Sequence, residues 1–126
     1  GVTGDNLLQI LESRLDNAVF RLGFGRSRAQ SRQLVSHGHF LVNGKKVDVP
    51  SYLVRNGDKI EISEKSKKSE MFKTMNLDEE MKDRNVPEWL KSDRKNGSGD
   101  VLSRPETDDM EIGIQTRLII EYYSRR

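Results

Sequence analysis

Residues 27–47, SRAQSRQLVSHGHFLVNGKKV, decide how this chain folds. Ser27 is a favoured helix N-cap residue, and Gly38 stands where a helix would end, so the segment between them predicts a short helix. Asn43-Gly44 lies between strand-like residues and predicts a β-hairpin, because a type I′ turn needs positive φ at both central positions. We therefore expect a polar helix that is followed directly by a hairpin.

The segment before this stretch, residues 5–22, predicts helical structure. Thr3 or Asp5 can cap its start, and Gly23-Phe24-Gly25 ends it. Whether the segment is one helix or two, with a break near Ser13, stays open. Apolar residues recur there at spacings of three and four, which places them on one stripe: Leu8, Leu11, Leu15, Val19 and Leu22.

The segments after the hairpin alternate between strand and helix signals. Asn56-Gly57-Asp58 predicts a turn, residues 59–62 a half-buried strand and residues 64–84 a charged helix. Pro87-Glu88-Trp89-Leu90 predicts a short helical or anchoring turn, with Trp89 in the core. Residues 95–99 predict a flexible loop, and residues 118–123 a strand. The fold class that follows is α+β, with short helices packed on one face of a mostly antiparallel sheet.

Composition limits the classes of function. The 126 residues suit one domain with appended segments, and the absence of cysteine excludes disulfides and thiolate metal sites. No apolar run approaches the roughly 18–20 residues of a membrane span, and the first residues do not resemble a signal peptide. The sequence therefore favours a protein of a reducing compartment that has no membrane partner.

Charge is distributed unevenly along the chain. The formal net charge is +2, but residues 14–46 hold seven basic residues against one acid, Asp16, which leaves the remainder net acidic. Such an asymmetry suits a polyanionic partner. The helix predicted after Ser27 is polar on most of its circumference and has few apolar residues to bury, so it offers a wide hydrogen-bonding face. Its first amides, beside Arg26 and Arg28, are suited to bind phosphate.

A series of short motifs along the chain resembles the pattern of a known domain family. They are Arg14-Leu15-Asp16, Arg21-Leu22-Gly23, Ser27-Arg28, His37-Gly38, Val42-Asn43-Gly44, Pro50, and Gly57-Asp58 before Ile60. In this order and spacing, residues 14–62 resemble the S4 RNA-binding domain, a small αL-type module of two short helices and a hairpin-containing sheet. The flanks, including PEWL, SRPE and LIIEYYSR, are similar to the bacterial-type small-subunit ribosomal protein S4 family, without the N-terminal portion of that family.

The resemblance implies a non-enzymatic function and a division of the chain. Residues 14–62 would form the RNA-binding module, and residues 1–13 and 63–126 would be flanking segments that pack with it. The family binds 16S-type small-subunit ribosomal RNA directly, nucleates subunit assembly and supports the accuracy of translation. Its partners are ribosomal RNA, neighbouring small-subunit proteins and messenger RNA where it enters the subunit. We thus expect a cytoplasmic, ribosomal protein without cofactor or metal.

The candidate RNA contacts are donors of hydrogen bonds and positive charges near the two helices and the hairpin. Arginine suits this task through its bidentate fork to phosphate. The set comprises Arg14, Arg21, Arg26, Ser27, Arg28, Gln30, Arg32, Gln33, His37, Asn43, Lys45 and Lys46. Arg14 has an alternative role, because it can pair with Asp16 or with a backbone carbonyl.

Three other interpretations carry less weight. A free-standing S4-domain factor that acts on ribosomal particles would share residues 14–62 but lack the LIIEYYSR tail. A fragment of a pseudouridine synthase could use Asp16 of Arg14-Leu15-Asp16, but the catalytic sheet that would hold this aspartate is absent from the pattern. His37 and His39 lack a third metal ligand nearby in sequence, so a helix-end role for His37 is preferred.

Overall fold

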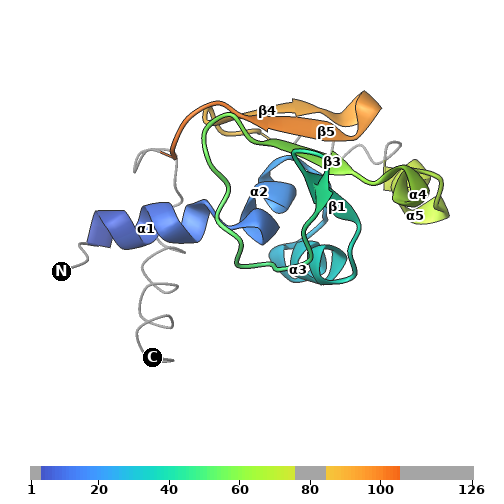
Figure 1. Ribbon diagram of the computed structural model, residues 1–126, viewed down its shortest axis with the longest axis horizontal. Coiled ribbons are helices and arrows are strands. Elements are labelled where there is room, and N and C mark those ends of the chain that lie inside the picture. Colours follow the sequence, from blue (N-terminus) through green and yellow to red (C-terminus); the bar gives the residue numbers. More distant parts are fainter. Residues whose placement is uncertain (1–3, 76–84, 106–126) are drawn as a thin grey trace.

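The computed structural model describes residues 4–75 and 85–105 of the chain (Figure 1). Its helices and strands are short and follow one another in the order α1 (Gly4–Glu12), α2 (Leu15–Arg21), α3 (Arg28–Ser36), β1 (Phe40–Val42), β2 (Lys45–Lys46), β3 (Lys59–Ile62), α4 (Glu64–Lys67), α5 (Glu70–Met75), β4 (Leu90–Asp93), the 3₁₀ turn η1 (Arg94–Asn96) and β5 (Ser98–Val101). The α+β class is confirmed.

Residues 5–22 form two helices and not one. Arg14 is extended (φ −63°, ψ 144°), which ends α1 and restarts the helix as α2. The amides of Leu15 and Asp16 donate to the carbonyls of Tyr52 and Pro50 at 2.7 and 3.1 Å. A distant loop therefore provides the acceptors that the first turn of α2 needs. Because the break changes the helical phase, Leu7 is fully buried in α1, whereas Leu8 and Leu11 are only half-buried.

The boundaries of α3 agree with the prediction. The hydroxyl of Ser27 accepts a hydrogen bond from the amide of Gln30, so Ser27 is the N-cap. His37 is the C-cap, and Gly38 follows with φ 81°. A residue with a side chain would be strained at Gly38, because positive φ favours glycine.

The described strands form one antiparallel sheet in the order β2-β1-β3-β5-β4. Asn43 and Gly44 connect β1 to β2 with φ values of 52° and 82°, as a type I′ turn requires. Gly57 has φ 90° in the turn before β3, which confirms the turn predicted at residues 56–58. Figure 1 shows α2 and α3 below the sheet, with α4 and α5 at one end of it.

The core lies between the sheet and helices α2 and α3. Its buried members from the helices are Leu15, Ala18, Val19, Leu22, Leu34 and Val35, and they meet Phe40, Val42, Ile60, Ile62, Leu90 and Val101 of the sheet. Trp89 is 1% exposed, which confirms its predicted place in the core. The rings of Phe24 and Phe40 stack with centroids 6.3 Å apart.

Two segments differ from their predictions. Residues 95–99 do not form a loop, because η1 turns the chain and β5 begins at Ser98. Gly99 is buried, and a Cβ built there would lie 2.5 Å from a methyl group of Leu22, so glycine permits β5 to approach α2 closely. Residues 64–75 form two short helices, α4 and α5, in place of one long helix. The predicted continuation to residue 84 and the strand at 118–123 lie outside the described residues.

Within the part of the chain that is described, no helix is long and apolar enough to cross a membrane.

Candidate nucleic-acid interface

The outward side of α3 is polar except at Ala29, which is exposed near its start. Leu34, Val35 and Ser31 are buried, whereas Arg32, Gln33 and Ser36 are exposed. The exposed residues recur at helical spacing and therefore share one face. The Ser36 hydroxyl bonds to carbonyls of its own helix, which leaves the longer side chains to extend from this face. The helix forms the lower edge of the described part of the chain in Figure 1, away from β4 and β5.

The turn that precedes α3 is closed by two reciprocal hydrogen bonds. Ser27 accepts from the amide of Gln30, and the side-chain oxygen of Gln30 accepts from the amide of Arg26 at 2.5 Å. This arrangement resembles a capping box and fixes the backbone from Arg26 to Gln30. Arg26 and Ser27 are exposed at this turn, so both stand beside the positive end of the α3 dipole.

Arg28 is held in place by two residues of α2. Its guanidinium carbon lies 4.6 Å from the centroid of the Phe20 ring, and its Nε donates to Oδ1 of Asn17 at 3.2 Å. Asn17 is itself fixed, because its Nδ2 donates to the backbone carbonyl of Glu12 at 2.7 Å in a buried position. Neither Phe20 nor Asn17 was predicted as part of the site. The only sequence signal for their role in holding Arg28 was that they stand three residues apart, and so lie on one face of α2.

Two predicted contacts have acidic partners instead. Arg21 is 9% exposed and donates from Nε and Nη2 to both carboxylate oxygens of Glu12, at 3.0 and 3.1 Å. Arg14 donates to both oxygens of Asp16, at 3.1 and 3.0 Å, which is the alternative role left open for it. Contact of Arg21 and Arg14 with RNA stays a prediction. In the structure, each of them is paired with a carboxylate of the protein.

The hairpin contributes lysines beside the C-terminal end of α3. A Cβ built at Gly38 would lie 2.3 Å from Cε and 2.8 Å from Nζ of Lys46, so this side chain crosses the end of the helix. Its ammonium complements the negative end of the helix dipole. Lys45 is also exposed on β2. Asn43 points elsewhere, because its side chain donates to Asp58 and accepts from the amide of Lys59, both at 2.9 Å.

Two histidines lie at the same end of α3. The ring centroids of His37 and His39 are 6.4 Å apart. Partial burial lowers the pKa of His39, and the nearby His37 and Lys46 lower it further. His39 Nδ1 is 2.7 Å from the hydroxyl of Ser66, so its polar atom is directed into the protein. In residues 4–75 and 85–105 no group of three or more potential ligands could hold a metal.

The structure therefore brings most of the predicted residues onto α3 and its two ends. Arg26, Ser27 and Gln30 lie at the start, Arg28, Arg32 and Gln33 along the helix, and His37 with Lys46 at its end. Lys45 lies beside Lys46 on β2. Arg14, Arg21 and Asn43 stand apart from this group because each is bound to another part of the protein. We call the first nine residues the α3 surface.

Comparison with known proteins defines the class of this fold. Residues 13–60, which include α2, α3, β1, β2 and the start of β3, match the S4 domain family. Residues 13–60 of the chain thus match the S4 domain class.

The similarity extends beyond the domain. The chain is 52% identical over 125 residues to small ribosomal subunit protein uS4 of Dehalococcoides mccartyi (strain CBDB1), and 58% identical over 124 residues to that of Sulfurihydrogenibium sp. (strain YO3AOP1). These matches cover 99% and 98% of the chain. The chain spans 59% and 60% of the length of these two curated relatives.

Proposed function

We propose that this chain is the part of a structural protein of the small ribosomal subunit that binds small-subunit ribosomal RNA directly through the α3 surface. The observation that carries the proposal is the arrangement of α3, whose exposed face is polar and cationic and whose Arg28 is fixed by Phe20 and Asn17. The identity of more than half of the aligned residues to uS4 proteins supports the same conclusion.

The chemistry of the α3 surface suits RNA backbone. Double-stranded RNA has a deep, narrow major groove, so proteins recognise it mainly by shape, phosphates and 2′-hydroxyls. Arg26, Arg28 and Arg32 provide planar donors for phosphate oxygens, and Lys46 provides a point charge. Gln33 and His37, one turn apart, can donate to or accept from 2′-hydroxyls. Each phosphate that these cations neutralise releases counterions, so binding should weaken with added salt.

We propose in addition that the protein has the wider function of its relatives in the subunit. It would nucleate assembly, support the accuracy of translation and contact neighbouring small-subunit proteins, and it would meet messenger RNA where that RNA enters the subunit. This function is non-catalytic, and its place is the ribosome in the cytoplasm. The division into a module at residues 14–62 and flanking segments also stays a prediction. Pairing of β3 with β5 joins the second flank to the same sheet.

The two rival functions have less support. In a modifying enzyme, Asp16 would need a free carboxylate, but both its oxygens accept from Arg14, and one also accepts from the amide of Asn17 at 2.7 Å. A free-standing S4-domain factor would share the domain alone. The observed similarity to uS4 covers nearly the whole chain, which favours the ribosomal protein.

A footprint on small-subunit ribosomal RNA tests the proposal. The chain should protect a limited set of nucleotides, and a variant with Arg28→Ala and Arg32→Ala should lose those protections at a salt concentration where the parent keeps them. Protection that is spread evenly over the RNA and disappears alike for both proteins at raised salt would indicate non-specific charge attraction and would refute the proposal.

A further inference from the structure

A cavity lies between β3, α4, α5 and the turn η1. Its volume is about 150 Å³, roughly ten times what one water molecule requires, so it can hold a group of several atoms. Ile62 and Phe72, each 3% exposed, form its apolar part. Lys67 of α4 and the η1 residues Arg94, Lys95 and Asn96 provide its polar part.

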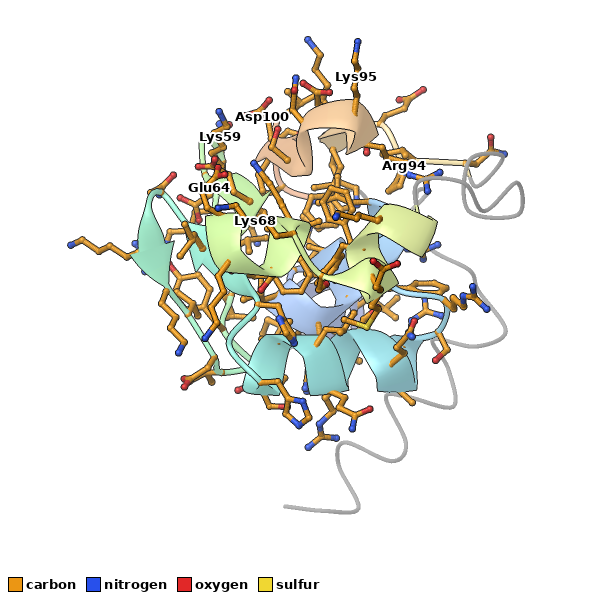
Figure 2. The ribbon with its side chains drawn as sticks, turned by 90° about the vertical axis from the view of Figure 1, so that its right-hand side faces the viewer. Lys59, Glu64, Lys68, Arg94, Lys95 and Asp100 are labelled. Atoms are coloured by element: carbon orange, nitrogen blue, oxygen red, sulfur yellow. The ribbon has the colours of Figure 1, made fainter. Side chains whose placement is uncertain are left out.

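The polar lining consists mainly of hydrogen-bond donors. The seven lining residues, all in the described part of the chain, include three cations and no acid. Figure 2 shows Lys59 and Lys68 on the same side of the molecule as Arg94 and Lys95. A guanidinium and two ammonium groups around a partly dehydrated cavity favour an anion with several acceptor oxygens.

Of the described acids near the cavity, Glu64 and Asp93 each have a side-chain partner. Glu64 pairs with Lys67 at 3.2 Å, but its side chain is 84% exposed, so this ion pair is weak and easily exchanged. Asp93 accepts from the amide and the side chain of Asn96, which lower its pKa most, and the charges of Lys59 and Lys95 lower that pKa further. Asp100 is a cross-strand partner of Lys59 and Lys91. None of these three acids lines the cavity.

The backbone around the cavity is held by the sheet. Gly97 ends η1 with φ 67°, and its carbonyl accepts from the amide of Ile62 at 2.8 Å. A Cβ built at Gly97 would lie 3.2 Å from Cε of Lys67, so the lysine stem passes over this turn. The cations are thus presented by a short, hydrogen-bonded hairpin and by α4, which limits how far they can separate.

We propose that this cavity binds a phosphate group of an RNA backbone and provides a second RNA contact, separate from the α3 surface. The inference rests on the proposed function, because a protein that binds ribosomal RNA through the α3 surface has further RNA phosphates close by. In Figure 2, Lys95 lies at the top and Arg94 in the upper right, whereas α3 forms the lower edge of the described part. One protein molecule would therefore bridge two RNA segments. The second contact then forms at a high effective concentration once the first is made.

The salt dependence of RNA binding tests the second contact. Replacement of Lys67 and Lys95 by alanine should lower the slope of log Kd against log salt by about one unit for small-subunit ribosomal RNA, since roughly 0.7–0.9 units are expected per phosphate contact. The matched control is Lys65→Ala with Lys73→Ala, which removes the same charge from exposed positions on α4 and α5 that do not line the cavity. Arg94 stays in place, and thermal unfolding verifies that both variants fold.

Directed RNA cleavage shows whether there are two separate contacts. The chain has no cysteine, so single cysteines can carry a tethered iron chelate without background. Ser36→Cys reports from the end of α3, and Glu64→Cys reports from beside the cavity. Cleavage at two separate RNA segments is expected. Cleavage from Ser36→Cys alone would overturn the second contact and leave the α3 surface intact.

The remaining outcomes separate the inference from the function on which it rests. If the Arg28→Ala, Arg32→Ala variant binds RNA like the parent, the proposed function fails. If that variant is impaired but the Lys67→Ala, Lys95→Ala variant matches its control, only the second contact fails. If inorganic phosphate shifts the Gly97 amide resonance while the RNA slope is unchanged, the cavity is a site for a free small anion, and the RNA assignment is overturned.

Discussion

The guanidinium of Arg28 lies 4.6 Å from the centre of the Phe20 ring, which ties a cation of α3 to the aromatic side chain of the preceding helix. The same guanidinium donates to Asn17, whose amide is anchored on the Glu12 carbonyl. A long arginine side chain normally loses considerable rotamer freedom on binding a ligand. Here that ordering is already present in the protein, so Arg28 is preorganised for the RNA contact that we propose for it.

Replacement of Phe20 by leucine should weaken RNA binding without changing its salt slope. Leucine retains apolar bulk but removes the ring face, and an exposed cation–π contact contributes about 0.5–1 kcal/mol. We expect a roughly twofold to fivefold rise in Kd, measured by filter binding. The slope should stay constant because no charge is removed. Phe20→Tyr keeps the ring and is the control. Equal losses for tyrosine and leucine would contradict a role of the ring in holding Arg28.

Removal of two cations from α3, unlike replacement of Phe20, should change the salt slope of RNA binding. With Arg28→Ala and Arg32→Ala, the slope of log Kd against log salt should fall by about one to two units, because up to two phosphate contacts are lost. The control pair Lys65→Ala, Lys73→Ala removes the same charge elsewhere. An unchanged slope in the arginine variant would show that these arginines do not contact phosphates, and an equal fall in the control would show that they act only through net charge.

Sequence predicted those parts of the fold that depend on local conformation. Ser27, Gly38, Asn43 and Gly57 mark caps and turns because each has a backbone preference that neighbouring residues do not alter. The structure confirms all four positions. The α3 surface was predictable for the same reason, since a helix with defined ends and few apolar residues must expose its polar face.

The parts that sequence missed depend on contacts between distant residues. The break at Arg14 is stabilised by carbonyls of residues 50 and 52, which no local pattern reveals. The sequence around Gly99 predicts a loop. The structure shows that glycine is needed there because Leu22, at the end of α2, packs closely against it. Arg21 is paired with Glu12 across the same break, so a cation that sequence assigned to RNA is largely buried.

The β1–β2 hairpin offers a test of backbone strain without steric clash. A Cβ at Gly44 would meet no atom within 4 Å, yet its φ of 82° is unfavourable for a β-branched residue. Gly44→Val should therefore lower the free energy of unfolding by about 1–3 kcal/mol. Urea denaturation measures the loss, and amide resonances of Leu41 and Val42 should move. Gly44→Asn, which tolerates positive φ, should lose much less. Equal stability of the valine variant and the parent would show that the turn is not of this type.

Variants of the Arg21–Glu12 ion pair can separate the structural role of Arg21 from a role of Arg21 in RNA binding. The carboxylate side chain is 4% exposed and the guanidinium side chain 10%. Glu12→Ala should destabilise the fold by about 3–5 kcal/mol, because it leaves a buried charge without its partner. The double variant Glu12→Leu, Arg21→Met should recover most of that loss, since apolar side chains of similar volume can replace a buried pair. Thermal unfolding of the single and double variants measures both effects.

The same double variant then decides how Arg21 acts. If the arginine serves only to hold α1 against α2, the double variant should bind ribosomal RNA with the affinity and the salt slope of the parent. The backbone carbonyl of Glu12 would still accept from Asn17, so the support of Arg28 is preserved. A stable double variant that binds RNA more than tenfold more weakly, with a slope reduced by about one unit, would instead make Arg21 the phosphate contact that its sequence position predicts.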